Sequence, residues 1–206
     1  IDESMVKYKG RIDFKQYMPM KPIKRGFKIW TRADKGYLSN FQIYTDKHSD
    51  NPEVGLGGRV VLDMMEGLQQ KEYHAYFDNI FTTTNLIAKL QEKMIYSCGT
   101  VRSGRKKLPK LCKDNDLSRG DFDFASYKDK INCVKCKDKR VIQVLSSIHS
   151  PNQAACTANK REKYGSITQI NCPQSIMDYR KFMGGVDKAN MMKCYYEIAR
   201  KSLRGS

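Results

Sequence analysis

The amino-acid sequence predicts a mixed α/β fold that opens with antiparallel strands and continues with alternating helices and strands. Between residues 5 and 44, three segments rich in alternating, aromatic or β-branched residues are separated by turn signals. Between residues 60 and 101, apolar residues twice recur at helical spacing, and a short strand pattern follows each helix. From residue 102 the pattern becomes polar and irregular, which indicates an inserted β-rich module.

The opening strands are expected at Met5–Lys9, Phe27–Thr31 and Tyr37–Tyr44. Gly10 ends the first of them, in which successive side chains alternate with the period of a strand. Asp34-Lys35-Gly36 is a turn signal of the kind that joins neighbouring antiparallel strands. The chain is therefore expected to begin as an antiparallel meander.

The following segment is expected to hold two helices. The first is amphipathic and runs from Val60 to about residue 70, after which Tyr73–Phe77 forms a short aromatic strand that places Asp78 at its end. Thr82–Thr84 offers an N-cap for the second helix, and Ile95–Val101 is the strand that follows it.

These patterns divide the chain into three parts, residues 1–101, 102–174 and 175–206. The first part begins a mixed α/β core, and the second is the β-rich insertion, with a clear strand at Val141–Ile148. The third part completes the core with a helix expected over Val186–Leu203.

The chain carries a formal net charge of +16, from 38 lysine and arginine residues against 22 acidic ones. This excess favours a nucleic acid or an anionic membrane surface as the partner, and a solvated basic surface without a partner is the alternative. No run of about 18 apolar residues is present, so no membrane association through a spanning helix is expected. The chain starts inside an expected strand, without an initiator methionine or a secretion signal, and we expect it to be a fragment.

The seven cysteines are odd in number and scattered, as is usual in a reducing compartment. Cys133-Val-Lys-Cys136 has the spacing of half a zinc site, but no second pair follows at a suitable distance. We therefore expect no zinc in this segment. His48, His74 and His149 are isolated in the sequence, and we expect them to be ordinary structural residues.

Three aspartates at the ends of expected elements are candidate metal ligands. Asp2 begins the first strand, Asp78 ends the strand after the first helix, and Asp187 begins the last helix. Aspartate oxygens bind Mg²⁺ or Mn²⁺, and two such ions held by shared carboxylates activate water and stabilise a leaving oxygen in phosphoryl transfer. From spacing alone, a strand end, a turn and a helix N-cap explain the same three residues.

Six stretches carry a resemblance to a known family: Ile1–Arg11, Gln16–Lys28, Phe77–Thr83, Gly99–Ser103, Met183–Asp187 and Tyr195–Ser202. In residues and in order, they are similar to the transposase domain of the piggyBac family, which includes relatives domesticated by their hosts. The resemblance implies a ribonuclease H-like fold with an insertion between the second and third acids.

The resemblance also implies a catalytic site of Asp2, Asp78 and Asp187 with two Mg²⁺ or Mn²⁺ ions as cofactors. It implies DNA as the partner, strand cleavage and transfer through hairpin intermediates at TTAA-type targets, and a homodimer of the full-length protein in the nucleus. Arg105-Lys106-Lys107 is compatible with a nuclear import signal. The family commonly has another aspartate three residues after the third acid, where this chain has Asn190, so we expect weaker metal binding there.

Basic residues gather in two stretches without acids, within residues 14–33 and within residues 102–113. Such clusters bind phosphates without reading sequence, and Tyr17, Phe27 and Trp30 could stack on unpaired bases or belong to the core of a hairpin. The candidate DNA-binding residues are Lys21, Lys24, Arg25, Lys28, Arg102, Arg105, Lys106, Lys107, Arg200 and Lys201. The last two end the final helix, where the helix dipole explains basic residues equally well.

Two functions remain open at this point. The first is a transposase core, which the three aspartates favour. The second is a DNA-binding module derived from such an enzyme that has lost the chemistry, which Asn190 favours. A basic RNA-binding scaffold would explain the charge but not the ordered motifs.

Overall fold

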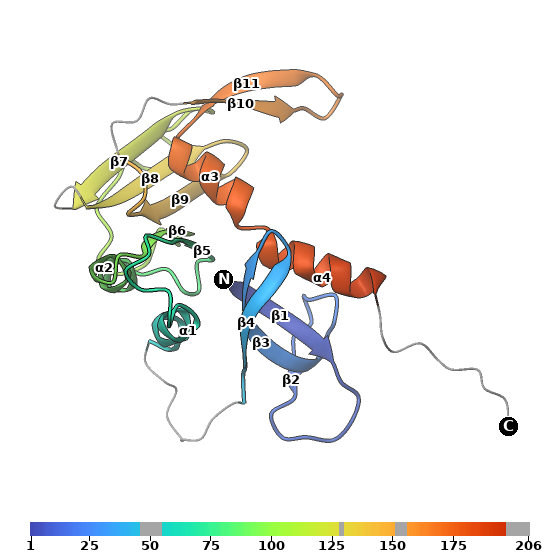
Figure 1. Cartoon of the computed structure of the whole chain (residues 1–206). Coiled ribbons are helices and arrows are strands. Elements are labelled where there is room, and N and C mark those ends of the chain that lie inside the picture. The colour runs from blue at the N-terminus through green and yellow to red at the C-terminus, as the bar shows by residue number, and fades with distance from the viewer. Residues whose placement is uncertain (46–54, 128–129, 151–155, 197–206) are drawn as a thin grey trace, which may run out of the picture. The chain divides into compact units, whose positions relative to one another are not determined.

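The computed structural model of the chain describes residues 1–45, 55–127, 130–150 and 156–196. The chain divides into two compact units, one made of Ile1–His48 with Gly184–Ser206 and the other of Ser49–Met183. Each unit contains its own sheet and helices, shown in Figure 1. The mixed α/β class predicted from the sequence is confirmed.

The first unit is an antiparallel sheet built around one long strand. Its elements are β1 (Asp2–Lys7), β2 (Gln16–Tyr17), β3 (Arg25–Asp34), β4 (Tyr37–Ile43) and α4 (Gly185–Tyr195). The central strand, β3, pairs with each of the other three strands. Lys35 and Gly36 form the turn between β3 and β4 with φ angles of 48° and 97°, a left-handed pair that favours glycine at the second position. The three predicted opening strands are thus confirmed.

The helix of the first unit, α4, packs on the sheet through a narrow face. Val186 and Ala189 are its buried residues, and Met5 and Trp30 are buried in the sheet. The helix predicted over Val186–Leu203 is confirmed as far as the end of α4, and its last residues lie outside the described ranges.

The second unit is a mixed sheet with helices and a separate hairpin. Its elements are α1 (Leu56–Met64), β5 (His74–Phe77), α2 (Thr84–Glu92), β6 (Tyr96–Thr100), β7 (Phe122–Tyr127), β8 (Ile131–Lys137), β9 (Val141–Ser146), β10 (Cys156–Arg161), β11 (Ile167–Cys172) and α3 (Gln174–Phe182). Five strands lie in the order β5-β6-β9-β8-β7, and only β5 and β6 are parallel, joined through α2. The strands β10 and β11 pair only with each other.

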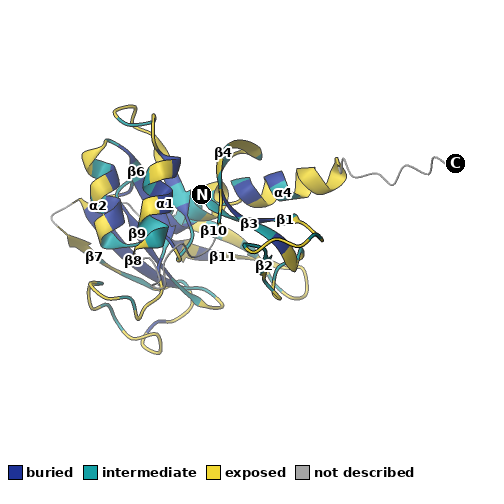
Figure 2. Cartoon of the chain, turned by 90° about the horizontal axis from the view of Figure 1, so that it is seen from below, coloured by how far each residue is buried: buried dark blue, intermediate teal, exposed yellow. Residues whose placement is uncertain are grey.

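The helices α2 and α3 cover opposite faces of the five-stranded sheet. Val134 and Val144 lie with Ile176 of α3 in one buried cluster. Cys133 and Leu145, their neighbours along the strands, point to the other face and lie with residues of α2. In Figure 2, α1 and α2 are each buried on one side and exposed on the other, as expected for amphipathic helices.

The alternation along β8 also separates the two thiols of the Cys133-Val-Lys-Cys136 motif. The Cys133 thiol accepts a hydrogen bond from Gln143 Nε2 at 3.0 Å, whereas Cys136 lies in the cluster on the α3 face with Cys172. Residues three apart in a strand face opposite sides, so these two thiols do not form one half of a metal knuckle.

Residues 102–174 are rich in β structure, but their strands do not all form a separate sheet. Three of them, β7 to β9, continue the sheet that β5 and β6 begin, because β9 pairs with the edge of β6. The strands β7–β9 thus belong to one sheet with β5 and β6, and the β10–β11 hairpin forms a separate ladder. The boundaries of an insertion in the domain sense stay a prediction.

Several elements differ from the sequence-based expectations, among them α1, β8 and α3. α1 spans Leu56–Met64 instead of residues 60–70, and the chain turns at Gly67, which has a φ of 78°. β8 was not predicted because it carries Lys135, a buried cation whose ammonium pairs with Asp114. α3 was not predicted because Ile176 is its one fully buried large side chain, so its sequence shows no clear apolar period.

No helix among the described residues has the length and apolar character needed to cross a lipid bilayer.

Ile176→Ala is expected to lower the free energy of unfolding by about 2–5 kcal/mol, because it leaves a cavity between α3 and the sheet. Urea unfolding followed by circular dichroism measures this loss. Ile167→Ala is the matched control, since Ile167 is 69% exposed and should cost no more than about 0.5 kcal/mol. Equal losses in the two variants would show that α3 does not complete the core.

Candidate functional site

The three candidate aspartates are distributed over both compact units. Asp2 on β1 and Asp187 in the first turn of α4 belong to the first unit, and Asp78, directly after β5, belongs to the second. Within the described ranges, no three carboxylate, imidazole or thiol side chains gather closely enough to hold a metal ion. The convergence of all three aspartates on one site therefore stays a prediction.

In the first unit, β1 and the middle of α4 lie side by side. Ser4 Oγ donates a hydrogen bond to Asn190 Oδ1 at 2.5 Å, and Lys193 Nζ donates to the carbonyl oxygen of Met5 at 3.1 Å. Residue numbers therefore rise in the same direction along the strand and the helix at this contact. Positions just before the Ser4–Asn190 contact on either element approach the same end of the unit.

Asp2 and Asp187 occupy those positions. Asp2 lies two residues before Ser4, on the same strand face, and Asp187 lies three residues before Asn190, on the same helix face. The end of β3 is a common neighbour: Thr31 pairs with Asp2 in the sheet, and the first turn of α4 approaches the backbone two residues further along β3. The fold thus brings two of the three predicted carboxylates to neighbouring elements.

Asn190 has a structural contact of its own. Its side-chain oxygen accepts the Ser4 hydroxyl hydrogen, and this bond joins α4 to β1. Asp187 is exposed, and no lysine or arginine in the described part of the chain pairs with its carboxylate. Asn190 therefore helps to hold the helix that carries Asp187 in place.

In the second unit, a tight turn after β5 holds Asp78. The Asp78 carbonyl oxygen accepts hydrogen bonds from the backbone N–H groups of Phe81 and Thr82, at 3.1 and 3.3 Å, and from Thr82 Oγ1 at 2.9 Å. The turn rests directly on β6 at Gly99, where a Cβ would lie 2.3 Å from Thr82 Oγ1. A glycine at this position allows the turn and the strand to approach closely.

Arg105 fixes this turn from the other side. Its guanidinium donates to the carbonyl oxygens of Thr82 at 2.7 Å and of Asn79 at 2.8 Å. Charged donors make stronger hydrogen bonds than neutral ones, so this fork holds the turn in one conformation. The half-buried Arg105 side chain thus binds backbone carbonyl groups of its own chain, although the sequence suggested that it contacts a phosphate.

The carboxylate of Asp78 is oriented by a hydroxyl pair. Thr100 Oγ1, at the end of β6, donates to Asp78 Oδ1 at 3.0 Å and lies 3.3 Å from the hydroxyl of Tyr179 on α3. Among the described residues, no lysine or arginine pairs with the Asp78 carboxylate. Asp78 is thus held by a neutral donor.

The first basic stretch divides into surface cations and one cation held inside the unit. Lys24 and Arg25 are exposed, Lys21 is half-buried, and the Arg25 guanidinium lies 5.1 Å from the centre of the Tyr17 ring. Lys28 instead pairs with Glu3 at 2.8 Å and lies 4.1 Å from the centre of the buried Trp30 ring. Lys28 is therefore part of the internal packing of the first unit.

The second basic stretch presents its cations to solvent, apart from Arg105. Arg102, Lys106 and Lys107 are exposed, and no acid in the described ranges forms an ion pair with them. Arg200 and Lys201, the other predicted DNA-binding residues, lie outside the described residues.

Sequence reasoning missed the residues that support the aspartates. Ser4, Thr100 and Tyr179 act through contacts between segments far apart in the chain. One local signal existed for Thr100. It ends a short strand two residues after the buried Cys98, so its side chain lies on the same, inward face of the strand. No such signal marked Tyr179, because its helix was not predicted.

Comparisons with known proteins identify the family of the chain. Residues 1–205 match the family model described as Transposase IS4. The human piggyBac transposable element-derived protein 3 is 35% identical over 214 residues, which cover 99% of this chain and 35% of that protein. The human piggyBac transposable element-derived protein 2 is 27% identical over 212 residues, which cover 98% of this chain and 36% of that protein. The chain thus spans about a third of the length of these curated relatives.

A solved structure is similar over most of the chain. It is the cryo-EM structure of a piggyBac transposase synaptic complex with hairpin DNA, with a TM-score of 0.77 and 26% sequence identity. The match covers 94% of this chain and 39% of that one.

Arg105→Met is expected to loosen the turn after β5, because both carbonyl contacts are lost while the aliphatic stem remains. Amide hydrogen exchange at Phe81 and Thr82 should become about tenfold faster or more, as expected for the loss of about 1.5–3 kcal/mol of charged hydrogen bonding. Arg102→Met is the control, since Arg102 is exposed, and it should leave these amides unchanged. Unchanged exchange in Arg105→Met would exclude the clamp.

Proposed function

Because the chain belongs to the transposase IS4 family and is of the piggyBac type, we propose that it is part of a transposase catalytic core that cleaves and transfers DNA strands at TTAA-type targets. We propose a ribonuclease H-like fold for this core, with residues 102–174 as its insertion. The full-length protein would act on DNA in the nucleus as a homodimer.

The surroundings of the Asp78 and Asp187 carboxylates carry this proposal. The chain has a net charge of +16, yet no lysine or arginine among its described residues neutralises either carboxylate. Carboxylates left unpaired in so basic a protein suit a divalent cation, since hard cations prefer carboxylate oxygens. The donor set therefore fits Mg²⁺ or Mn²⁺.

Asp2, Asp78 and Asp187 would hold these ions, which when bound would activate a water and stabilise the leaving oxygen of a phosphodiester. The chain's own residues set the geometry around them. Thr100 orients the Asp78 carboxylate, and the Ser4–Asn190 bond holds α4 against β1. A ligand held in one orientation in advance loses less entropy when the cation binds.

DNA is the partner that the basic surface and the solved relative support. That relative was captured with hairpin DNA, and this chain exposes Lys24, Arg25, Arg102, Lys106 and Lys107. Exposed cations bind phosphates through counterion release, so this binding would weaken steeply as salt rises.

A second candidate function is a domesticated DNA-binding module that has lost efficient catalysis. Asn190 favours it, because the position following Asp187 by one helical turn offers a neutral oxygen that already accepts the Ser4 hydroxyl. The two human relatives are themselves described as transposable element-derived proteins. The metal response of the chain separates the two functions.

Mn²⁺ is expected to raise the melting temperature of the chain under the transposase proposal, because it binds the folded state selectively. Asp78→Asn should abolish most of this rise, since it removes the charge while keeping the shape and the acceptor for Thr100. Asp116→Asn, at an exposed acid, is the control and should respond as the parent does. Differential scanning fluorimetry measures all three. An identical Mn²⁺ response in the parent and Asp78→Asn would favour the DNA-binding module.

Asn190→Asp is expected to increase the Mn²⁺-induced rise in melting temperature, because it adds a negative charge one helical turn from Asp187. Without metal, the same variant should melt slightly lower than the parent, since two like charges then lie close together. Asn171→Asp, at an exposed position of β11, should produce neither effect. A response of Asn190→Asp equal to that of the parent would place Asn190 outside the metal site.

A further inference from the structure

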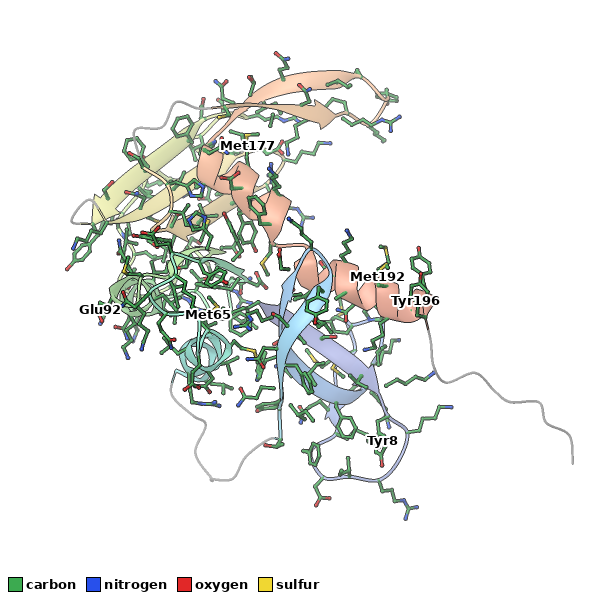
Figure 3. The ribbon with its side chains drawn as sticks, in the orientation of Figure 1. Tyr8, Met65, Glu92, Met177, Met192 and Tyr196 are labelled. Atoms are coloured by element: carbon green, nitrogen blue, oxygen red, sulfur yellow. The ribbon has the colours of Figure 1, made fainter. Side chains whose placement is uncertain are left out.

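A cleft of about 530 Å³ opens in the second unit between the start of α2, residues 107–109, and the strands β7 and β8. Its floor is apolar and includes Leu108, Ile131 and Leu145. A second hollow of about 220 Å³ shares Ala88, Tyr127 and Ile131 with it and continues toward Glu92, labelled in Figure 3. Neither hollow is lined by Asp78 or by the residues that hold it, so this cleft is separate from the candidate carboxylate site.

The walls of the cleft combine an aromatic side chain with hydrogen-bonding groups. Tyr127 lines both hollows and is 64% exposed. Thr84 and Asn85 contribute polar side chains at the opposite wall. A volume of about 530 Å³ lies within the usual range for small organic ligands of roughly 300–1,000 Å³.

The charge around the cleft identifies the kind of ligand. Lys107 lines it directly, Lys106 and Lys110 are exposed on the same loop, and Lys130 borders the second hollow. In the described part of the chain, none of these four cations forms an ion pair with an acid. An apolar floor with an aromatic wall and a cationic rim is complementary to a planar ring attached to a phosphate chain.

We propose that this cleft binds an unpaired nucleotide of a DNA strand, with the base against Tyr127 and the apolar floor and the adjoining phosphates at Lys106 and Lys107. The proposal rests on the proposed function in taking DNA as the partner, and it adds that this surface prefers single strands. In a duplex, stacking and pairing keep the base faces from entering such a cleft, and only the phosphates would reach the lysines.

The test compares Tyr127→Ala with Tyr164→Ala by fluorescence anisotropy, using a labelled single-stranded 15-mer and its duplex. Tyr164, on the β10–β11 hairpin, is 92% exposed and is the matched control for the loss of one surface tyrosine. Tyr127→Ala should bind the single strand about tenfold more weakly and the duplex less than twofold more weakly. Tyr164→Ala should match the parent on both, and circular dichroism should show that all three proteins are folded.

A pair of lysine variants tests the phosphate contact independently. Lys107→Gln should weaken binding of the single strand and reduce the slope of log affinity against log salt by about one unit. Lys163→Gln, an exposed control near the hairpin turn, should leave the slope unchanged. A strand with one 5-bromodeoxyuridine should also photocross-link to the peptide that contains Tyr127.

The outcomes separate this proposal from the one it rests on. If the parent binds both DNAs but Tyr127→Ala loses no more single-strand affinity than Tyr164→Ala, the cleft proposal is wrong and the proposed function stands. If the parent binds neither DNA at low salt, both are wrong. Cross-linking elsewhere in the chain, with Tyr127 unmodified, also overturns the cleft proposal.

Discussion

Two hydrogen bonds from one guanidinium constrain the turn of the second unit that carries Asp78. Arg105 holds the carbonyl oxygens of Asn79 and Thr82, and so fixes the turn whose first residue is Asp78. The turn can lie this close to β6 because Gly99 has no side chain. The same arginine belongs to the basic loop that borders the cleft, so an acidic residue and a cationic surface are anchored by one side chain.

The elements that the sequence predicted well are those whose signals are local. The turn at Lys35-Gly36 and the Thr83 N-cap of α2, which accepts a hydrogen bond from the N–H of Leu86 at 3.0 Å, form from neighbouring residues. β8 and α3 were missed because their positions depend on distant partners. In the sequence, Lys135 looks like an exposed loop residue. In the fold its ammonium is buried, where it pairs with the Asp114 carboxylate and donates a hydrogen bond to the Cys112 carbonyl oxygen.

The candidate site shows the same limit. Motif order and resemblance identified the three aspartates as candidates, but residue type alone could not tell which cations remain available for a ligand. Lys28 and Arg105 look like phosphate contacts in the sequence, yet Glu3 and two backbone carbonyl groups occupy them in the fold. The supporting hydroxyl of Thr100 was hidden because it reaches Asp78 from 22 residues away.

The strands β10 and β11 form a hydrogen-bonded ladder of their own, so the length of this hairpin can change during evolution. Its strands share no register with the five-stranded sheet, so its tip can gain or lose residue pairs without displacing any strand of that sheet. Ion pairs from Glu162 to Arg119 and from Lys160 to Asp138 attach the end of the hairpin nearest its turn to the rest of the second unit. Homologous chains can therefore differ in length here and still keep the scaffold around Asp78.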